Sequence, residues 1–174
     1  MLAERMTGAK MGDRIVHVGC AHGGRLAAVV GKAGLSGHVV AVVPDDEAAS
    51  RAQRGAMSAG VLVDVQVAPP SRLPLDSSAF DLVVVDDTKG LLGAMSADER
   101  ARALRECLRV LRPSGRAVII SATAPAGLAG LFSRGRADAP YEAEPALLAA
   151  GFRAARTLGE REGLRFVEGL KPSA

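Results

Sequence analysis

The chain has 174 residues, which is enough for one folded domain with a core of its own. Hydrophobic residues make up 48% of it and aromatic residues only 3%, so it is not a disordered chain, and its core is expected to be aliphatic. The formal net charge of +3 arises from charges of both signs, with no stripe of Lys and Arg between aromatic residues. A nucleic-acid-binding surface is therefore not indicated.

The cysteines and the hydropathy of the chain bear on its environment. The two cysteines, Cys20 and Cys107, argue against a disulfide framework and predict a reducing, cytoplasmic location. The most apolar stretch, residues 117–132, is interrupted by proline and polar residues, so no membrane span is expected. The first ten residues lack the apolar segment of a signal peptide. We expect one domain over residues 1–174, without a linker or an internal repeat.

Short β-branched segments alternate with longer helical segments along the chain. Strands are predicted at residues 14–18, 38–43, 61–67, 80–85 and 117–121. Helices are predicted at residues 25–32, 45–59 and 142–150, and a further one begins at Ser96. Residues 152–158 and 164–170 predict a terminal β-hairpin. This alternation predicts an α/β fold with a mostly parallel sheet that helices cover on both faces.

The helix that follows Ser96 has the clearest signals in the sequence. Ser96 and Glu99 have the spacing of a capping box, which satisfies free N–H groups in the first turn. One buried face is predicted at helical spacing by Leu104, Cys107, Leu108 and Leu111. Pro113 and Gly115 then end the helix.

A glycine-rich turn, GCAHGG over residues 19–24, follows the first predicted strand and opens a helix. Glycines let the backbone approach a ligand closely, and the N-terminus of a helix offers free N–H groups. A tight strand–helix turn without a ligand would use the same residue types. On this segment alone both interpretations stay open.

Several segments together resemble class I S-adenosylmethionine-dependent methyltransferases, particularly the group that includes the ubiquinone-biosynthesis type. The segments are MGDRIVHVGCAHGG, GLSGHVVAVVPDDEAASRAQ, LPLDSSAFDLVVVDD, ECLRVLRPSGRAVII and LLAAGFRAARTLGEREGLRFVEGLK. ECLRVLRPSGRAVII is the most specific of them, and the resemblance runs from Gly12 to Leu170. It implies a Rossmann-like three-layer sandwich whose seven-stranded sheet has the order 3-2-1-4-5-7-6, with strand seven antiparallel.

The resemblance also implies S-adenosylmethionine as the cofactor, held at the carboxyl ends of the strands. The cofactor-binding residues that it implies are His17, Gly19, Cys20, Ala21, His22, Gly23, Val43, Pro44, Asp45 and Asp86. Where the family usually has an acid, a glycine, a ribose-binding acid and an adenine-binding aspartate, this chain has His17, Ala21, Val43 and Pro69. Each lost contact weakens binding by about 1.5–3 kcal/mol.

Asp45 lies two residues past Val43 and is the candidate for binding the ribose hydroxyls, although stabilising the N-terminus of the next helix is an alternative role. His22 is interpreted either as a base or, more simply, as a polar cap of the turn. His17 is interpreted either as a ligand or as a core histidine. Cys20 is expected to pack rather than to react.

Methyl transfer from a sulfonium depends mainly on alignment and desolvation, so no catalytic triad is expected and no catalytic residue is assigned. Asp86 and Asp87 follow the fourth strand, where ligands bind in such sheets, but a solvated loop or a capping pair is the alternative. Ala122 and Thr123 stand where metal-dependent relatives carry further ligands, so no metal is predicted.

About a dozen residues precede the first strand, so the acceptor side would depend on residues 122–141. This connection contains Phe132, Arg134, Arg136 and Tyr141, which would line a small pocket or form a surface loop. A short cap also predicts a large or partner-presented substrate, a partner subunit that completes the site, or no substrate. Exposed apolar area at the missing cap would favour a homodimer or a partner.

Three functions follow from these observations. The first is methyl transfer to an acceptor that the sequence does not identify. The second is a methyltransferase-like pseudoenzyme, with weakened or lost cofactor binding, that serves as a binding or structural subunit. The third is a dinucleotide-dependent oxidoreductase, which is disfavoured because the second strand lacks the acidic residue that would bind a ribose.

Overall fold

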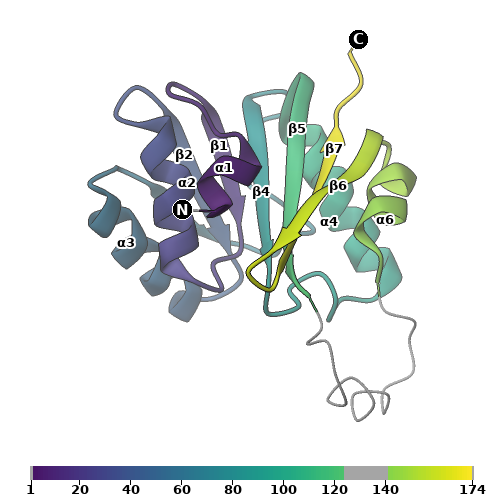
Figure 1. Cartoon of the computed structure of the whole chain (residues 1–174), viewed down its shortest axis with the longest axis horizontal. Coiled ribbons are helices and arrows are strands. Elements are labelled where there is room, and N and C mark those ends of the chain that lie inside the picture. The colour runs from purple at the N-terminus through teal and green to yellow at the C-terminus, as the bar shows by residue number, and fades with distance from the viewer. Residues whose placement is uncertain (1, 124–140, 174) are drawn as a thin grey trace.

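The structure is a computed structural model that describes residues 2–123 and 141–173 (Figure 1). The strands are β1 (Arg14–Val18), β2 (His38–Val43), β3 (Asp64–Val67), β4 (Phe80–Asp87), β5 (Leu111–Ala122), β6 (Arg153–Arg161) and β7 (Leu164–Leu170). The helices are α1 (Leu2–Thr7), α2 (Gly23–Ala33), α3 (Asp46–Ala59), α4 (Ala97–Val110) and α6 (Ala143–Ala150).

All seven strands form one sheet with the order β3-β2-β1-β4-β5-β7-β6. The pairs from β3 through β5 are parallel, whereas β7 is antiparallel to both β5 and β6. The predicted strand order, with its antiparallel seventh strand, is therefore confirmed. Because β1 and β4 are neighbours while the chain leaves β1 towards β2, the strand order reverses between them, and ligands bind at such a reversal in open α/β sheets.

The helices form layers on both faces of the sheet (Figure 1). One core cluster joins the sheet to α2 and α3, with Leu26, Val29 and Ala52 among its members. The cluster on the opposite face joins the sheet to α4 and α6, with Leu104 and Leu147 among its members. The predicted three-layer arrangement is confirmed, and it explains why the central strands are apolar on both faces.

Local sequence signals fix the helix ends. The capping box at Ser96 is present, with the Glu99 N–H donating to the Ser96 hydroxyl at 3.3 Å and the Ser96 N–H donating to the Glu99 carboxylate at 3.2 Å. Asp45 caps α3, and the glycines Gly60 and Gly151 end α3 and α6 in the left-handed conformation.

Some element boundaries differ from the sequence-based prediction. β3 begins at Asp64 rather than residue 61, because it is an edge strand whose pairing with β2 starts at Val40 and Asp64. β4 continues through Asp87, since β5 pairs with it to the end.

β5 begins at Leu111 rather than residue 117, because Leu111 already pairs with Phe80. α4 therefore ends at Val110, and Leu111, Pro113 and Gly115, which were predicted to complete and end the helix, lie in β5. α1 was not predicted.

Phe132, Arg134 and Arg136 lie outside the described residues. None of the described helices combines the length and the apolar character that crossing a bilayer requires.

Candidate functional site

The glycine-rich turn lies at the carboxyl end of β1 and is held tightly by its own chain. Gly19 has a φ of +74°, and its N–H donates a hydrogen bond to the Val42 carbonyl at 2.8 Å. A Cβ atom at this position would lie 2.7 Å from Leu91 Cδ2 and 3.3 Å from the Asp86 carbonyl oxygen. Gly19 is therefore required by both its backbone conformation and the Leu91 side chain that covers it.

The Asp86 carboxylate, at the end of β4, accepts hydrogen bonds from the backbone of this turn. Its Oδ2 atom accepts hydrogen bonds from the backbone N–H groups of Ala21 at 3.0 Å and His22 at 3.3 Å. Its Oδ1 atom accepts the Thr88 hydroxyl at 2.7 Å, and the Arg25 guanidinium lies 3.4 Å away. The Asp86 side chain is fully buried, so the alternative of a solvated loop does not hold for it.

Asp86 and His17 are both buried beneath the turn. Burial raises the pKa of Asp86, but the positive charge of a protonated His17, the Thr88 hydroxyl and Arg25 hold it below its ordinary value. Burial lowers the pKa of His17, which therefore stays neutral near pH 7. His17 Nδ1 lies 2.7 Å from the Gly19 carbonyl oxygen and must donate to it, which leaves Nε2 as an acceptor. Nε2 is buried and has no partner among the described residues.

The neighbouring residues of the turn have mainly structural contacts. The exposed His22 caps α2, because its Nδ1 accepts the Gly24 N–H at 3.1 Å. The carbonyl oxygen of Cys20 accepts Arg51 Nε at 2.9 Å. Burial raises the pKa of the Cys20 thiol to about 11, so this cysteine is a poor nucleophile at neutral pH.

Gly23 lies at the contact between α2 and α3. A Cβ atom on Gly23 would come within 2.8 Å of the Arg51 carbonyl oxygen, and one on Gly55 within 2.5 Å of the Gly23 carbonyl oxygen. Gly23 and Gly55 thus let the two helices approach closely, which explains their presence without any ligand.

The remaining predicted residues lie at the carboxyl end of β2. Val43 is buried, and Pro44 and Asp45 are exposed. Asp45 Oδ1 accepts the Ala48 N–H at 2.7 Å, which is the helix-capping role anticipated as an alternative. Pro69 is exposed, and neither Val43 nor Pro69 offers a polar side-chain atom.

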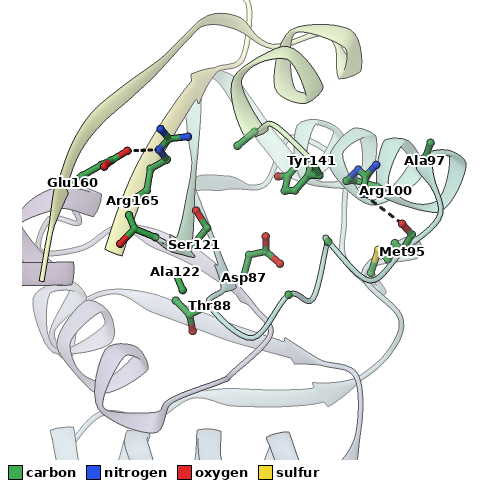
Figure 2. Close-up of a pocket in the computed structure, with 14 residues that line it drawn as sticks. Asp87, Thr88, Met95, Ala97, Arg100, Ser121, Ala122, Tyr141, Glu160 and Arg165 are labelled. Atoms are coloured by element: carbon green, nitrogen blue, oxygen red, sulfur yellow. Dashed lines mark hydrogen bonds and ion pairs between the residues drawn. The ribbon is translucent and has the colours of Figure 1, made fainter. Parts of the chain in front are cut away.

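A second feature of the same sheet edge is a cleft of about 880 Å³ beside the ends of β4 and β5 (Figure 2). None of the ten predicted cofactor-binding residues lines it. Its polar side chains come from six separate segments of the chain. They include Asp87, Arg100, Ser121, Tyr141, Glu160 and Arg165.

Asp87 is the buried acid of this cleft, with 6% of its surface exposed, so it too is not a solvated residue. Its Oδ1 atom accepts the Leu92 N–H at 2.6 Å and so holds the turn after β4. Burial raises the pKa of Asp87 above its ordinary value. A carboxylate in this state accepts a proton more readily than an exposed aspartate does.

Tyr141 contributes a hydroxyl to the cleft. The Arg100 guanidinium lies over its ring, 4.6 Å from the centroid. The hydroxyl is buried and has no hydrogen-bond partner among the described residues. Burial raises the pKa of Tyr141, which keeps it a neutral hydroxyl that can donate or accept one hydrogen bond.

Sequence reasoning singled out Tyr141 and Asp87 but missed Arg100, Ser121 and Arg165. Arg100 looked like one of several helix-surface charges, and Arg165 belongs to the terminal hairpin. No local sequence pattern indicates that these three side chains lie in one cleft. Within residues 2–123 and 141–173, no group of three His, Cys, Asp or Glu side chains is arranged to hold a metal ion.

The chain is similar to known methyltransferases in sequence and in fold. The family model described as a methyltransferase domain matches residues 16–119. No curated protein matches the sequence significantly. A SAM-dependent methyltransferase from Aquifex aeolicus aligns with a TM-score of 0.73 and 21% identity over 95% of this chain and 86% of its own.

Two further solved structures show the same fold. A SAM-dependent methyltransferase from Methanosarcina mazei aligns with a TM-score of 0.68 and 21% identity over 95% of each chain. The [4+2]-cyclase SpnF aligns with a TM-score of 0.71 and 20% identity over 99% of this chain and 80% of its own. At these identities the structural likeness establishes the fold alone.

Proposed function

Because the chain belongs to the class I S-adenosylmethionine-dependent methyltransferase family, we propose that it transfers a methyl group from S-adenosylmethionine to an acceptor bound in the cleft beside Asp87. The match to the methyltransferase domain covers β1 through most of β5. The cofactor assignment, the activity and the acceptor site are the parts of this proposal that need a test.

One observation carries the proposal: Asp86 and Asp87 are adjacent on β4 and face opposite sides of the sheet. Asp86 contacts the glycine-rich turn, and Asp87 lines the cleft. Side chains alternate along a strand, so one dipeptide separates a cofactor side from an acceptor side at the same sheet edge. Methyl transfer requires such adjacency, because donor and acceptor must be aligned.

The residues at the turn fit one end of the cofactor better than the other. At the turn, His17 Nε2 is a buried acceptor without a partner among the described residues, and the Asp86 carboxylate, which is paired with Arg25, contacts the turn backbone. Both suit the cationic amino-acid end of S-adenosylmethionine. At the nucleoside end Val43 is apolar, and the exposed Asp45 carboxylate is the candidate for the ribose hydroxyls.

When bound, S-adenosylmethionine supplies an electrophilic methyl group on a sulfonium. Asp86 would hold the turn in place through the Ala21 and His22 N–H groups. Tyr141 would orient an acceptor through its hydroxyl, which has no partner among the described residues. The raised pKa of Asp87 suits it to take a proton from a hydroxyl or amine acceptor.

A second candidate function is that of a methyltransferase-like binding subunit with weak or no cofactor binding. Leu91 favours this alternative, because its side chain lies against Gly19 and takes up space beside the turn. The apolar residues at positions 43 and 69 favour it too. Such a subunit would act as a homodimer or with a partner protein.

Calorimetry with S-adenosylmethionine and S-adenosylhomocysteine separates the two candidates. Micromolar binding that is lost in a folded G19V variant supports methyl transfer and justifies a search for the acceptor. No binding up to millimolar concentration rejects it and favours the binding subunit, whose mass in solution would then be measured by light scattering. Circular dichroism of G19V shows whether lost binding reflects lost folding.

A further inference from the structure

The charged groups that line the cleft differ in whether the chain itself supplies their partners. Arg165 Nε donates to the Glu160 carboxylate at 2.5 Å, and both side chains are about half exposed, so this pair is balanced at the entrance of the cleft. Arg100 Nη1 donates to the carbonyl oxygens of Leu92 at 3.2 Å and Met95 at 3.4 Å. Both arginines are therefore engaged with their own chain, which disfavours the anionic group of a ligand as the main binding group.

Asp87 is the exception among these charged groups. Its carboxylate is buried, and within the described residues it contacts two backbone N–H groups, that of Leu92 at 2.6 Å and that of Gly93. No salt bridge joins it to a Lys, Arg or His within residues 2–123 and 141–173. Burial raises the pKa of Asp87, and Arg100 has the smallest effect among the groups that shift it. A buried charge is costly unless an opposite charge pairs with it, so a cationic ligand group suits this position.

The Tyr141 hydroxyl is a second group of the cleft without a partner, and it lies near the first. Figure 2 shows Asp87 between Ser121 and Tyr141. Burial raises the pKa of Tyr141, and the negative charge of Asp87 raises it further. The neutral hydroxyl has no hydrogen-bond partner among the described residues. A carboxylate and a hydroxyl oxygen together offer acceptors for the N–H groups of an ammonium ion.

The size and the lining of the cleft limit the rest of the ligand. Its volume of about 880 Å³ lies within the range of about 300–1,000 Å³ that is typical of small-molecule sites. Tyr141 is the one aromatic side chain among the described lining residues, and the Arg100 guanidinium covers its ring at 4.6 Å from the centroid. An aromatic ligand would find little to stack on, whereas an aliphatic chain can pack against Met95, Ala122 and Ala143.

We propose that the methyl acceptor is a small aliphatic primary amine, whose ammonium group binds to the Asp87 carboxylate and the Tyr141 hydroxyl. The transfer step rests on the proposed function, whereas the binding of the amine does not. In that step the ammonium group gives one proton to Asp87. The lone pair of the neutral amine then forms the N–C bond to the methyl group, while the C–S bond breaks and its electron pair stays on sulfur. The products are the N-methylammonium ion and S-adenosylhomocysteine, and Asp87 releases its proton to solvent.

The first experiment measures amine binding without the cofactor. The probes n-butylamine, butan-1-ol and butyrate share one alkyl chain and differ in the group that would meet Asp87. At pH 7 and roughly 20 mM, with ionic strength matched by NaCl, n-butylamine should raise the melting temperature of the wild type by at least about 2 °C, and the other two by less than about 0.5 °C. An equal response to the alcohol or the carboxylate, or no response to the amine, would overturn the proposal.

The second experiment locates the amine with variants. D87N removes the charge and keeps an oxygen that can accept the Leu92 N–H, so the response to n-butylamine should fall below about 0.5 °C in a folded protein. D76N is the matched control, because Asp76 is an exposed acid that precedes the amino end of β4, and it should keep the wild-type response. If D87N does not fold, Y141F removes the other binding group and should at least halve the response. A wild-type response in D87N, or in Y141F where that variant is used, would contradict the proposal.

Methyl transfer to the same probes separates this proposal from the proposed function. With S-adenosylmethionine labelled in its methyl group, label should appear in N-methylbutylamine and not in methyl butyl ether or methyl butyrate. If the protein binds no S-adenosylmethionine but n-butylamine stabilises the wild type and not D87N, the proposed function fails while the amine site stands. If S-adenosylmethionine binds and n-butylamine does not, the proposed function stands and the amine proposal fails.

Discussion

The Nδ1–H group of the fully buried His17 donates a hydrogen bond to the carbonyl oxygen of Gly19 at 2.7 Å. This contact ties the end of β1 to the turn that follows it. It also fixes the tautomer, so a second proton could enter only at Nε2, which has no partner among the described residues. Protonation of His17 therefore opposes folding.

This contact predicts a pH dependence of stability. Burial lowers the pKa of His17 in the folded protein below its ordinary 6.5, so the unfolded chain binds more protons between those two values. The free energy of unfolding is then highest above about pH 6.5 and falls as the pH drops from 7 to 5, by at most about 1.4 kcal/mol per pH unit. Urea unfolding at pH 7, 6 and 5 measures the slope.

H17N tests this prediction, and H38N is its matched control. H17N keeps an N–H donor for Gly19 and removes the titrating ring, so the slope between pH 7 and 5 should flatten. His38 is exposed at the start of β2, and H38N should keep the wild-type slope. The same slope in H17N as in the wild type would show that His17 does not titrate with folding.

The close contact of α2 with α3 gives a second prediction. In G55A the new Cβ would lie 2.5 Å from the Gly23 carbonyl oxygen, so the helices must separate, and we expect a loss of about 1–3 kcal/mol. Gly31 is the control, because it lies on the exposed side of α2 with nothing within 4 Å of its Cβ position. G31A should gain about 0.5–1 kcal/mol from helix propensity.

Chemical denaturation of both variants measures these differences. A G55A protein as stable as G31A would mean that the helices are not in contact at Gly23, and the arrangement of the turn above them would need revision.

Gly19 and Leu91 give a third prediction, because they are far apart in sequence but in contact in space. G19A places a Cβ 2.7 Å from Leu91 Cδ2 at a φ of +74°, so both a clash and backbone strain destabilise it. L91A removes the clash and leaves the strain of about 1 kcal/mol. In a double-mutant cycle the double variant should be more stable than the sum of the single effects predicts, by about 0.5–3 kcal/mol. Additive effects would contradict the contact.

The fold was largely predictable because its signals are local. The capping box at Ser96 and the Gly60 and Gly151 stops are short patterns whose geometry the structure reproduces. The strand order came from the resemblance to the methyltransferase family, since alternating strands and helices leave the order of a sheet open. The confirmed order places the carboxyl ends of β1 and β4 side by side.

The chemistry of the site was less predictable for a physical reason. β4 is apolar on both faces, so its sequence has no alternation that tells which face Asp86 or Asp87 occupies. Only the packed structure shows that Asp86 meets Ala21 and that Asp87 meets the cleft. The contact of Leu91 with Gly19 likewise depends on how the turn after β4 folds back.

The last prediction concerns Tyr141, whose variants distinguish a structural role of its hydroxyl from a functional role. Its hydroxyl is buried without a partner among the described residues, whereas its ring lies under Arg100 at 4.6 Å. Y141F keeps the ring and removes a desolvated polar atom, so the free energy of unfolding should stay the same or rise by up to about 1 kcal/mol. Y141L also removes the ring contact with Arg100 and should be less stable than Y141F.

The same pair of variants tests the acceptor site. If the Tyr141 hydroxyl binds the acceptor, Y141F should lower kcat/KM about five- to tenfold for any acceptor that is found, while the Kd for S-adenosylmethionine stays constant. A Y141F protein that loses more than about 1 kcal/mol of stability would show that the hydroxyl has a structural partner. In that case the acceptor would be sought against Asp87 and against Arg165, whose Nε donates to Glu160 at 2.5 Å.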